Sequence, residues 1–209
     1  MSHNPITEKD ILNILQPETE SELTLISHPE IISGLLWGEP RYGHPEGKVL
    51  YHIPEIYDNI NRIATPLSID DRQKLRLITI LHDSFKYIED KNYPRDWSKH
   101  HSILARLFAE NYIDDSIVLD IIELHDEAYY CWRLEILEDE PEQASARLDM
   151  LFDKIGYCLQ LYYIFFKCDT STGDKTQAPV KWFEKKIKNI EDIKPIYFTQ
   201  CPPENIGNR

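Results

Sequence analysis

Glycine is scarce in this chain, with 7 residues among 209. The sequence contains no glycine-rich loop of the kind that holds nucleotide phosphates. It also has no run that alternates apolar and polar residues beyond a few positions, whereas apolar residues recur at intervals of three and four in several long segments. The absences disfavour a sheet and a phosphate loop, and the periodicity predicts a mainly helical, all-α protein.

Positive charge is also in short supply. The chain has 36 acidic and 23 basic residues, which gives a formal net charge of -13. Proteins that bind DNA or RNA usually present an extended basic surface, and the excess of acidic residues argues against such a surface in this chain. Nucleic acid is therefore not predicted as a main partner.

Paired cysteines and long apolar runs are missing as well. The four cysteines form no CxxC pair, which is typical of a reducing compartment. The longest apolar segment, residues 155–168, is too short to span a bilayer and is interrupted by polar residues. The N-terminal residues are polar and lack the basic and apolar regions of a signal peptide. We expect a cytoplasmic protein without a membrane partner, and the oligomeric state stays open.

Apolar residues make up 42% of the chain and charged residues 28%, which is typical of a folded globular protein. The length suits a single domain over residues 1–209. We expect its core at about 44–192, with the N-terminal segment and the C-terminal tail peripheral.

Helical periodicity predicts six helices and a last amphipathic piece. Their approximate ranges are 7–15, 54–65, 69–89, 98–112, 115–135, 143–168 and 179–193. Pro54 suits an early helical position, and Ser68 is suited to cap the third helix. The sixth helix is apolar on most sides and is expected at the centre. The acidic stretch 138–143 is expected to be a solvated loop.

Residues capable of binding metal interrupt the apolar face of several predicted helices. His82 follows Ile78 by four residues and precedes Phe85 by three, which places its imidazole on the buried side. Asp83 is rotated from His82 by about 100° around the helix, so both side chains can reach a cation at the helix edge. A buried carboxylate without a partner is strongly disfavoured, and a positive group is expected beside it.

Other predicted helices also place a histidine or aspartate side chain on their buried face. His125 follows Ile121 by four residues on its stripe, and Asp169 follows Phe166 by three. The remaining candidates are His52, just before the second predicted helix, and His100 or His101, at the start of the fourth. A single buried histidine is more often a hydrogen-bonded core residue than a ligand. Five segments that each supply one such group are better explained by a shared metal centre.

Taken in order, these residues resemble the HD-domain superfamily of metal-dependent phosphohydrolases. His82 and Asp83 with Lys86 match an HDxxK pattern, and the segment HPEGKVLYHI (44–53) is similar to the HPEG lead-in of several HD branches. The resemblance covers about residues 44–175. It implies an HD-domain-like helical bundle with a central metal site.

The resemblance also implies one ion held by four side chains and a second held by three, with one carboxylate shared. The first set is His52, His82, Asp83 and Asp169, and the second is Asp83, His101 and His125. Asp174 is the alternative to Asp169, and helical register favours Asp169. Imidazole and carboxylate ligands suit Fe, Mn, Co, Ni or Zn, and a site of carboxylates and water also accepts Mg. One or two divalent ions are therefore expected, without a choice among these metals.

Two further positions have competing candidates. His100 and His101 both lie near the apolar face of their predicted helix, and His101 is preferred. His125 and Asp126 form a second His-Asp pair. The aliphatic run before residue 82 and the presence of Lys86 favour the first pair as the defining one.

A centre of this kind attracts phosphate and activates water for in-line attack on phosphorus. The resemblance implies catalytic roles for Asp83, which touches both ions, and for Lys86, which contacts phosphoryl oxygens or orients the nucleophile. A salt bridge to Asp83 is the alternative role of Lys86. His44 is a candidate hydrogen-bond partner or leaving-group acid.

The predicted function is hydrolysis of a small phosphorylated metabolite, such as a nucleotide or a related phosphomonoester or phosphodiester. One alternative is an HD-fold oxygenase with a mixed-valence di-iron centre, and another is a metal-bound regulatory domain without turnover. The lysine of the HDxxK pattern favours hydrolysis.

Overall fold

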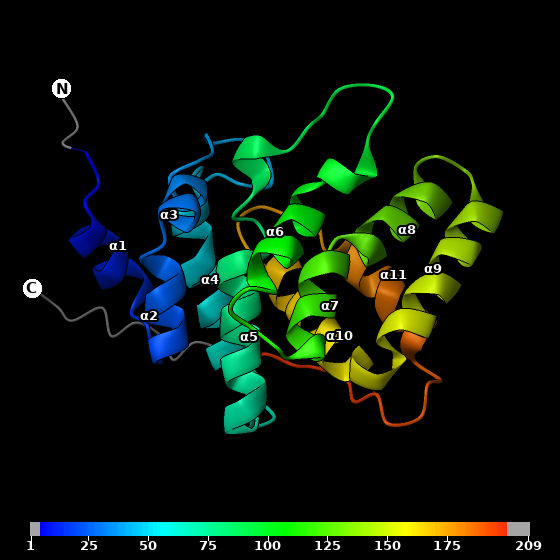
Figure 1. Ribbon diagram of the computed structural model, residues 1–209. Coiled ribbons are helices and arrows are strands. Elements are labelled where there is room, and N and C mark those ends of the chain that lie inside the picture. Colours follow the sequence, from blue (N-terminus) through cyan, green and yellow to red (C-terminus); the bar gives the residue numbers. More distant parts are fainter. Residues whose placement is uncertain (1–4, 200–209) are drawn as a thin grey trace, which may run out of the picture.

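The computed structural model describes residues 5–199, and within this range every regular element longer than an isolated bridge is a helix (Figure 1). The α-helices are α1 (Glu8–Leu15), α2 (Glu20–Ile26), α3 (Pro29–Leu35), α4 (Val49–Asn61), α5 (Ile69–Leu81), α6 (His101–Ala109), α7 (Ser116–Leu124), α8 (Glu127–Ile136), α9 (Pro141–Ile155), α10 (Leu159–Thr170) and α11 (Ala178–Ile187). Short 3-10 helices are η1 (Lys86–Ile88), η2 (Trp97–Lys99) and η3 (Gly156–Cys158). The all-α prediction is confirmed.

Helix α10 forms the centre of the bundle. It packs against α4, α5, α9 and α11. Tyr162 and Phe165 are among its buried residues, at 0% and 1% exposure. A helix that is apolar on nearly all sides gains most by being surrounded, because each buried large apolar side chain contributes about 1.5–3 kcal/mol. The apolar stretch 155–168 is therefore a core segment.

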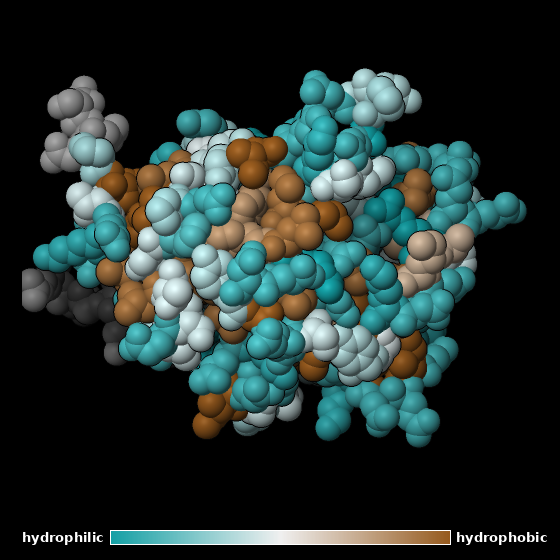
Figure 2. Space-filling view, viewed as in Figure 1, coloured by the Kyte–Doolittle hydropathy of each residue, from teal (hydrophilic) through white to brown (hydrophobic). Residues whose placement is uncertain are grey.

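The outer surface is mainly hydrophilic, in keeping with the excess of charged residues. On the face shown in Figure 2, apolar side chains gather near the centre, where α6 lies in Figure 1. Leu107 of α6 is 56% exposed. Among residues 5–199, no helix combines the length and the apolar character needed to cross a membrane.

The second predicted helix begins earlier than expected. Helix α4 starts at Val49, so it contains His52, and Pro54 lies inside it. An internal proline lacks a hydrogen-bond donor and costs about 3 kcal/mol. Ile53 and Ile56 on either side of it are 0% exposed, and their burial outweighs this cost. The prediction that His52 precedes the helix was wrong, and His52 instead projects from a buried helical face.

Three predicted helices are shorter or divided in the structure. Helix α5 ends at Leu81 rather than near residue 89. The predicted helix 115–135 is divided into α7 and α8, with His125 and Asp126 between them. The predicted helix 143–168 is divided into α9 and α10 by η3. The apolar periodicity continues through these breaks because both halves face the same core, so it did not reveal them.

The other boundaries differ by smaller amounts. Ser68 accepts a hydrogen bond from the Asp71 amide at 2.9 Å and caps α5 as predicted. Helix α9 begins at Pro141, so only the first part of the acidic stretch 138–143 is a loop. Helices α2 and α3 were not predicted, because each has 7 residues and is too short for a clear periodic pattern.

The N-terminal helices pack on the rest of the bundle, α1 and α3 on α4 and α2 on α5. Gly34 of α3 lies against Ser84, the residue after Asp83, and a Cβ at Gly34 would stand 1.8 Å from the Ser84 carbonyl oxygen. Only glycine allows this approach of α3 to the chain that follows α5. Helix α3 thereby supports the turn that carries Asp83.

A buried ion pair connects α2 to α5. Glu22 is 0% exposed and Arg76 is 3% exposed. The Arg76 Nη2 atom donates to Glu22 Oε2 at 2.7 Å, and Nε donates to Oε1 at 2.9 Å. The guanidinium also lies 3.9 Å from the centre of the Tyr57 ring. Either charge without the other would be uncompensated in a medium of low dielectric constant.

We expect Arg76→Ala to lower the free energy of unfolding by about 3–5 kcal/mol, because it leaves the Glu22 carboxylate buried and unpaired. The control is Arg133→Ala, which removes an exposed pair with Glu138 and should cost about 1 kcal/mol or less. Urea denaturation followed by circular dichroism measures both. Equal losses in the two variants would contradict the assignment of Arg76 to the core.

Candidate metal centre

The structure brings all six predicted metal ligands to one place in the bundle. His52, His82, Asp83, His101 and His125 are each 1–4% exposed, and the Asp169 side chain is 19% exposed. His52 lies in the first turn of α4. The others lie at helix ends: after α5, at the start of α6, after α7 and near the end of α10.

The first group surrounds the space between α4, α5 and α10. His52 Nε2 lies 2.8 Å from Asp169 Oδ1, and His82 Nε2 lies 4.0 Å from the same oxygen. His82 Nε2 is also 3.5 Å from Asp83 Oδ2. These three helices meet through their buried faces, so residues separated by more than a hundred positions in the chain share one small polar space.

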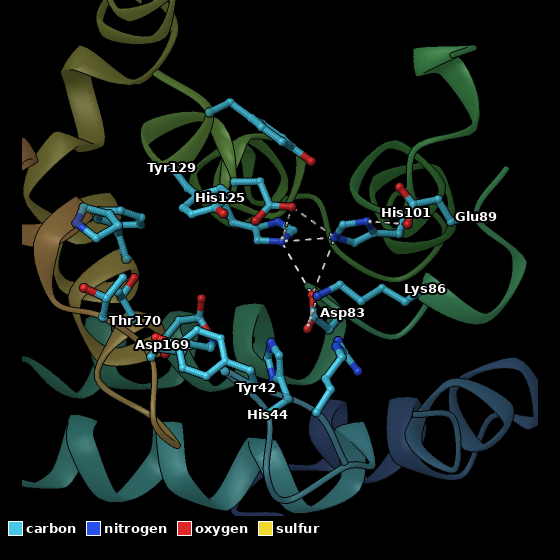
Figure 3. A pocket seen from close by; sticks show the side chains of 18 of the residues that line it. Tyr42, His44, Asp83, Lys86, Glu89, His101, His125, Tyr129, Asp169 and Thr170 are labelled. Carbon is cyan, nitrogen blue, oxygen red and sulfur yellow. Dashed lines mark hydrogen bonds and ion pairs between the residues drawn. The ribbon is translucent and has the colours of Figure 1, made fainter. Parts of the chain in front are cut away.

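The second group lies on the other side of Asp83. The Nε2 atoms of His101 and His125 are 3.3 Å apart, and Asp83 Oδ1 is 3.5 Å from the first and 3.6 Å from the second. Figure 3 shows both rings pointing toward each other and toward Asp83. One oxygen of Asp83 therefore faces His82, and the other faces this histidine pair.

Backbone carbonyls orient two of the imidazoles. His82 Nδ1 donates to the Thr79 carbonyl oxygen at 2.9 Å, and His125 Nδ1 donates to the Ile122 carbonyl oxygen at 2.8 Å. Carbonyls in the last turn of a helix have no partner inside the helix and are free to accept such bonds. The two histidines end α5 and α7 in the same way, and their Nε2 atoms face the shared space.

Buried glutamates orient the other two imidazoles. Glu46 Oε1 lies 3.3 Å from His52 Nδ1 and 2.9 Å from His44 Nδ1. Glu89 Oε2 lies 3.5 Å from His101 Nδ1. A carboxylate at Nδ1 holds the ring in place and leaves Nε2 to bind metal. Sequence reasoning missed both glutamates, although Glu46 belongs to the HPEG segment and its presence there was a usable signal.

Charge interactions set the protonation of the cluster. Burial would raise the pKa of Asp83, but the surrounding imidazoles and the Lys86 ammonium outweigh it and hold that pKa well below its usual value. Asp169 behaves in the same way because Lys175 and His52 lie beside it. Both groups are therefore carboxylates, the form that binds metal.

The histidines divide into two kinds. Burial lowers the pKa of His82 to about 3, and this outweighs the charges of Asp83 and Asp169. Burial also acts on His125, but the charges of Asp126 and Asp83 outweigh it and raise the pKa to about 9. In the ion-free protein, His125 thus carries a proton at the point where His101 and Asp83 converge. The cluster requires a positive charge there.

The distances fit a cation of the first transition series. Tetrahedral ligands about 2.1 Å from such an ion are about 3.4 Å apart. The separations among His101 Nε2, His125 Nε2 and Asp83 Oδ1 are 3.3, 3.5 and 3.6 Å. His82 Nε2 and Asp83 Oδ1 are buried without a hydrogen-bond partner among the described residues, which is costly unless a ligand meets them. The donors present therefore suit a metal ion.

The alternative candidates make other contacts, although His100 lies beside His101 and forms a further possible donor group with it and Glu89. His100 Nδ1 is 2.7 Å from Ser102 Oγ, and its Nε2 is 3.1 Å from the Tyr130 hydroxyl, so its ring is engaged at the start of α6. Asp174 Oδ1 accepts a hydrogen bond from the Gly43 amide at 2.6 Å and connects two loops.

Two lysines lie against the two predicted metal carboxylates. Lys86 Nζ donates to Asp83 Oδ2 at 2.6 Å, so the salt bridge named as its alternative role is present. Lys175 Nζ donates to Asp169 Oδ1 at 2.9 Å. Sequence reasoning missed Lys175. The loop that carries it has no periodic pattern, so the sequence does not indicate that its side chain contacts Asp169, six residues earlier.

A cavity of about 550 Å³ opens onto this cluster. Its lining combines the metal-binding groups with cations and aromatic rings. Besides Lys86 and Lys175, the basic lining residues are Arg41, Lys91 and Arg95. The aromatic ones include Trp37, Tyr42, Tyr129, Tyr130 and Phe166. The acidic lining residues are Asp83, Glu89, Asp126 and Asp169. With metal ions compensating these carboxylates, the five basic residues would favour an anionic ligand.

Metal affinity should rise with pH. Because the folded-state pKa of His125 is raised to about 9, a metal ion must displace its proton at lower pH. We expect the affinity for the ion at His101 and His125 to increase by about tenfold per unit between about pH 6 and pH 8, with release of one proton. Calorimetric titration with Zn²⁺ in buffers of different ionisation enthalpy measures both quantities. A constant affinity over this interval would show that His125 is already neutral.

Glu46→Gln removes the carboxylate charge beside His52 while keeping the size of the side chain. We expect it to lower affinity for the ion at His52 and His82 by about 10–100-fold. Glu39→Gln changes an exposed glutamate on the same loop and serves as the control. Competition with a chelator measures the affinity, and equal values for both variants would exclude an orienting role for Glu46.

The chain was also compared with known proteins. No match was found among protein families, curated proteins or solved structures. The resemblance to the HD-domain superfamily therefore depends on the ordered histidines and aspartates themselves. What the structure shows is a helical protein in which buried groups of histidine and acidic residues can hold metal ions.

Proposed function

We propose that the protein is a metal-dependent phosphohydrolase of the HD-domain type that acts on a small phosphorylated metabolite, such as a nucleotide or a related phosphomonoester or phosphodiester. The observation that carries the proposal is the position of Asp83. Its Oδ2 lies 3.5 Å from His82, its Oδ1 lies 3.5 Å from His101, and it borders the basic cavity. A carboxylate placed in this way suits a bridge between two cations.

Two divalent ions at these groups would lower the pKa of a water molecule towards about 7 and stabilise negative charge on a phosphoryl group. Imidazole and carboxylate donors favour Fe, Mn, Co, Ni or Zn over Mg, which prefers oxygen ligands alone. The protein supplies the donors in defined orientations, because His82 and His125 each donate a hydrogen bond from Nδ1 to a backbone carbonyl, and a glutamate lies 3.3 Å from His52 Nδ1 and 3.5 Å from His101 Nδ1.

Lys86 and Lys175 are the residues best placed to bind the phosphoryl oxygens. Their ammonium groups lie at the edge of the cluster, 2.6 Å from Asp83 and 2.9 Å from Asp169. When cations compensate the two carboxylates, each ammonium becomes available to a phosphate, and charge-assisted hydrogen bonds of this kind are roughly twice as strong as neutral ones. The two lysines would then hold the phosphoryl group from two sides.

His44 is better suited to accept a hydrogen bond than to protonate a leaving group. Its Nδ1 atom donates to Glu46 at 2.9 Å, which leaves Nε2 as the acceptor. Burial and the charge of Lys175 lower its pKa, so the neutral ring prevails at pH 7. We assign His44 to positioning a water molecule or a substrate hydroxyl group.

The five basic residues of the cavity, beside carboxylates that metal ions would compensate, support hydrolysis of an anion over activation of dioxygen, the alternative that the same ligand set allows. An oxygenase with a mixed-valence di-iron centre would be coloured and would give an electron paramagnetic resonance signal. A regulatory domain would bind metal and release no phosphate. Both alternatives are therefore separable from the proposal by direct measurement.

The test combines elemental analysis of the purified protein with phosphate release from a panel of phosphomonoesters and phosphodiesters in the presence of added metals. We expect Asp83→Ala to lose bound metal and to fall to background activity, since it removes the shared carboxylate. Lys86→Ala should keep the metal and lower kcat by about 10²–10³-fold. Lys99→Ala, at an exposed lysine, is the control.

Activity in metal-free Asp83→Ala protein would exclude the mechanism. Full metal occupancy without phosphate release from any compound would favour the regulatory alternative. Consumption of dioxygen by an iron-loaded protein would favour the oxygenase.

A further inference from the structure

Asp126 has no role in the ligand set that the sequence implies, yet it stands beside the second group of metal-binding residues. It occupies the break between α7 and α8, directly after His125. Its Oδ2 atom lies 3.4 Å from His101 Nε2 and 3.6 Å from His125 Nε2. It also borders the cavity, with its side chain 28% exposed.

We propose that Asp126 is a direct ligand of the ion at His101 and His125, which makes this position a site of four protein groups: His101, His125, Asp83 and Asp126. The inference rests on the metal-binding part of the proposed function. Five separations among the four donor atoms are 3.3, 3.4, 3.5, 3.6 and 3.6 Å. Two donors about 2.1 Å from one transition metal ion are about 3.4 Å apart in a tetrahedral site, so each of these five separations suits a pair of donors to the same ion.

The charges of the four groups also favour direct ligation. Two neutral imidazoles and two carboxylates around a divalent cation give an electrically neutral cluster, which a buried position tolerates far better than a charged one. Asp126 Oδ2 faces three imidazoles, since His100 Nε2 lies at 3.9 Å in addition to the two nearer rings. A carboxylate in this position needs positive charge beside it, which a metal ion at His101 and His125 would supply.

A second observation points to a ligand at the same place. The Asp83 Oδ1 atom, which faces His101 and His125, is buried and has no hydrogen-bond partner among the described residues. The buried ring nitrogens in front of it are 3.3 Å apart, a separation that two lone pairs do not tolerate without a cation or a proton between them. The space therefore has donors on four sides and a requirement for positive charge.

This assignment gives each ion four protein groups, with Asp83 shared between the two sets. The two sets differ in the groups beside them. Lys175 Nζ donates to Asp169 Oδ1 at 2.9 Å, and the His44 ring lies 5.1 Å from the His52 ring, so a cation and a further imidazole flank the first set. We therefore expect phosphate on the side of His52 and Asp169.

The test is metal binding by the full-length chain with Co²⁺ or Zn²⁺ as the probe. Asp126→Asn keeps the shape of the side chain and removes its charge, and Asp114→Asn removes the same charge from an exposed position. We expect Asp126→Asn to lower the affinity for one ion by at least about 10²-fold and to lose the strong visible absorption of tetrahedral Co²⁺. The other ion and the Asp114→Asn protein should match the wild type.

Asp126→Cys tests contact with the ion directly and remains informative if the asparagine variant folds poorly. A thiolate bound to Co²⁺ produces an intense charge-transfer band in the near ultraviolet, and a thiolate that is only nearby does not. We expect this band in Asp126→Cys and its absence in the wild type, because none of the described cysteines belongs to a group of donors that could hold a metal ion.

Three outcomes would contradict the assignment of Asp126 as a metal ligand. Unchanged affinity and unchanged tetrahedral absorption in Asp126→Asn, with no thiolate band in Asp126→Cys, would overturn the ligand role while leaving the proposed function intact. Retention of both ions with a loss of kcat and a shifted pH profile would also overturn it, and would make Asp126 an acid or base. A wild-type protein that binds no ion would end both the inference and the proposed function.

Discussion

Compensation of buried negative charge is the interaction on which the centre of this protein depends. Asp83 is 4% exposed, and Asp169 lies beside it in a helical core of low dielectric constant. Carboxylates in such a place are stable only with positive charge next to them. In the ion-free protein, Lys86, Lys175 and protonated His125 supply that charge. The groups that compensate the carboxylates therefore lie at the same place as the donors that could hold a metal ion.

Helix ends deliver most of these donors. An α-helix leaves its last carbonyls without partners, and His82 and His125 use them to fix their rings. At the start of α6, His101 faces Glu89, which lies in the loop that precedes it. Because the ends of α5, α6, α7 and α10 meet on one side of the bundle, the donors converge there, and the opposite faces of the same helices form the apolar core. The apolar faces of these helices thus stabilise the fold, and their ends form the candidate metal centre.

The agreement between sequence and structure is best where local periodicity carries the information. Ser68 caps its helix, α10 is central, and the predicted donors come together. The failures share one cause. The predicted helices 115–135 and 143–168 are each divided, and α4 begins at Val49 rather than at Pro54. In each case, packing against neighbouring helices outweighs the local preference of the sequence. Such packing energies arise between segments that the sequence does not place side by side.

The sequence by itself determined that the chain is helical and that histidines and aspartates interrupt its apolar stripes, since both follow from residue type and spacing. Only the tertiary structure decided which atoms meet. It set Glu46 behind His52, folded Lys175 onto Asp169 and turned Asp126 toward His101. Ring orientation and charge pairing depend on distances of a few ångströms between residues far apart in the chain. Periodicity defines the face on which a side chain lies, and packing alone defines what that side chain touches.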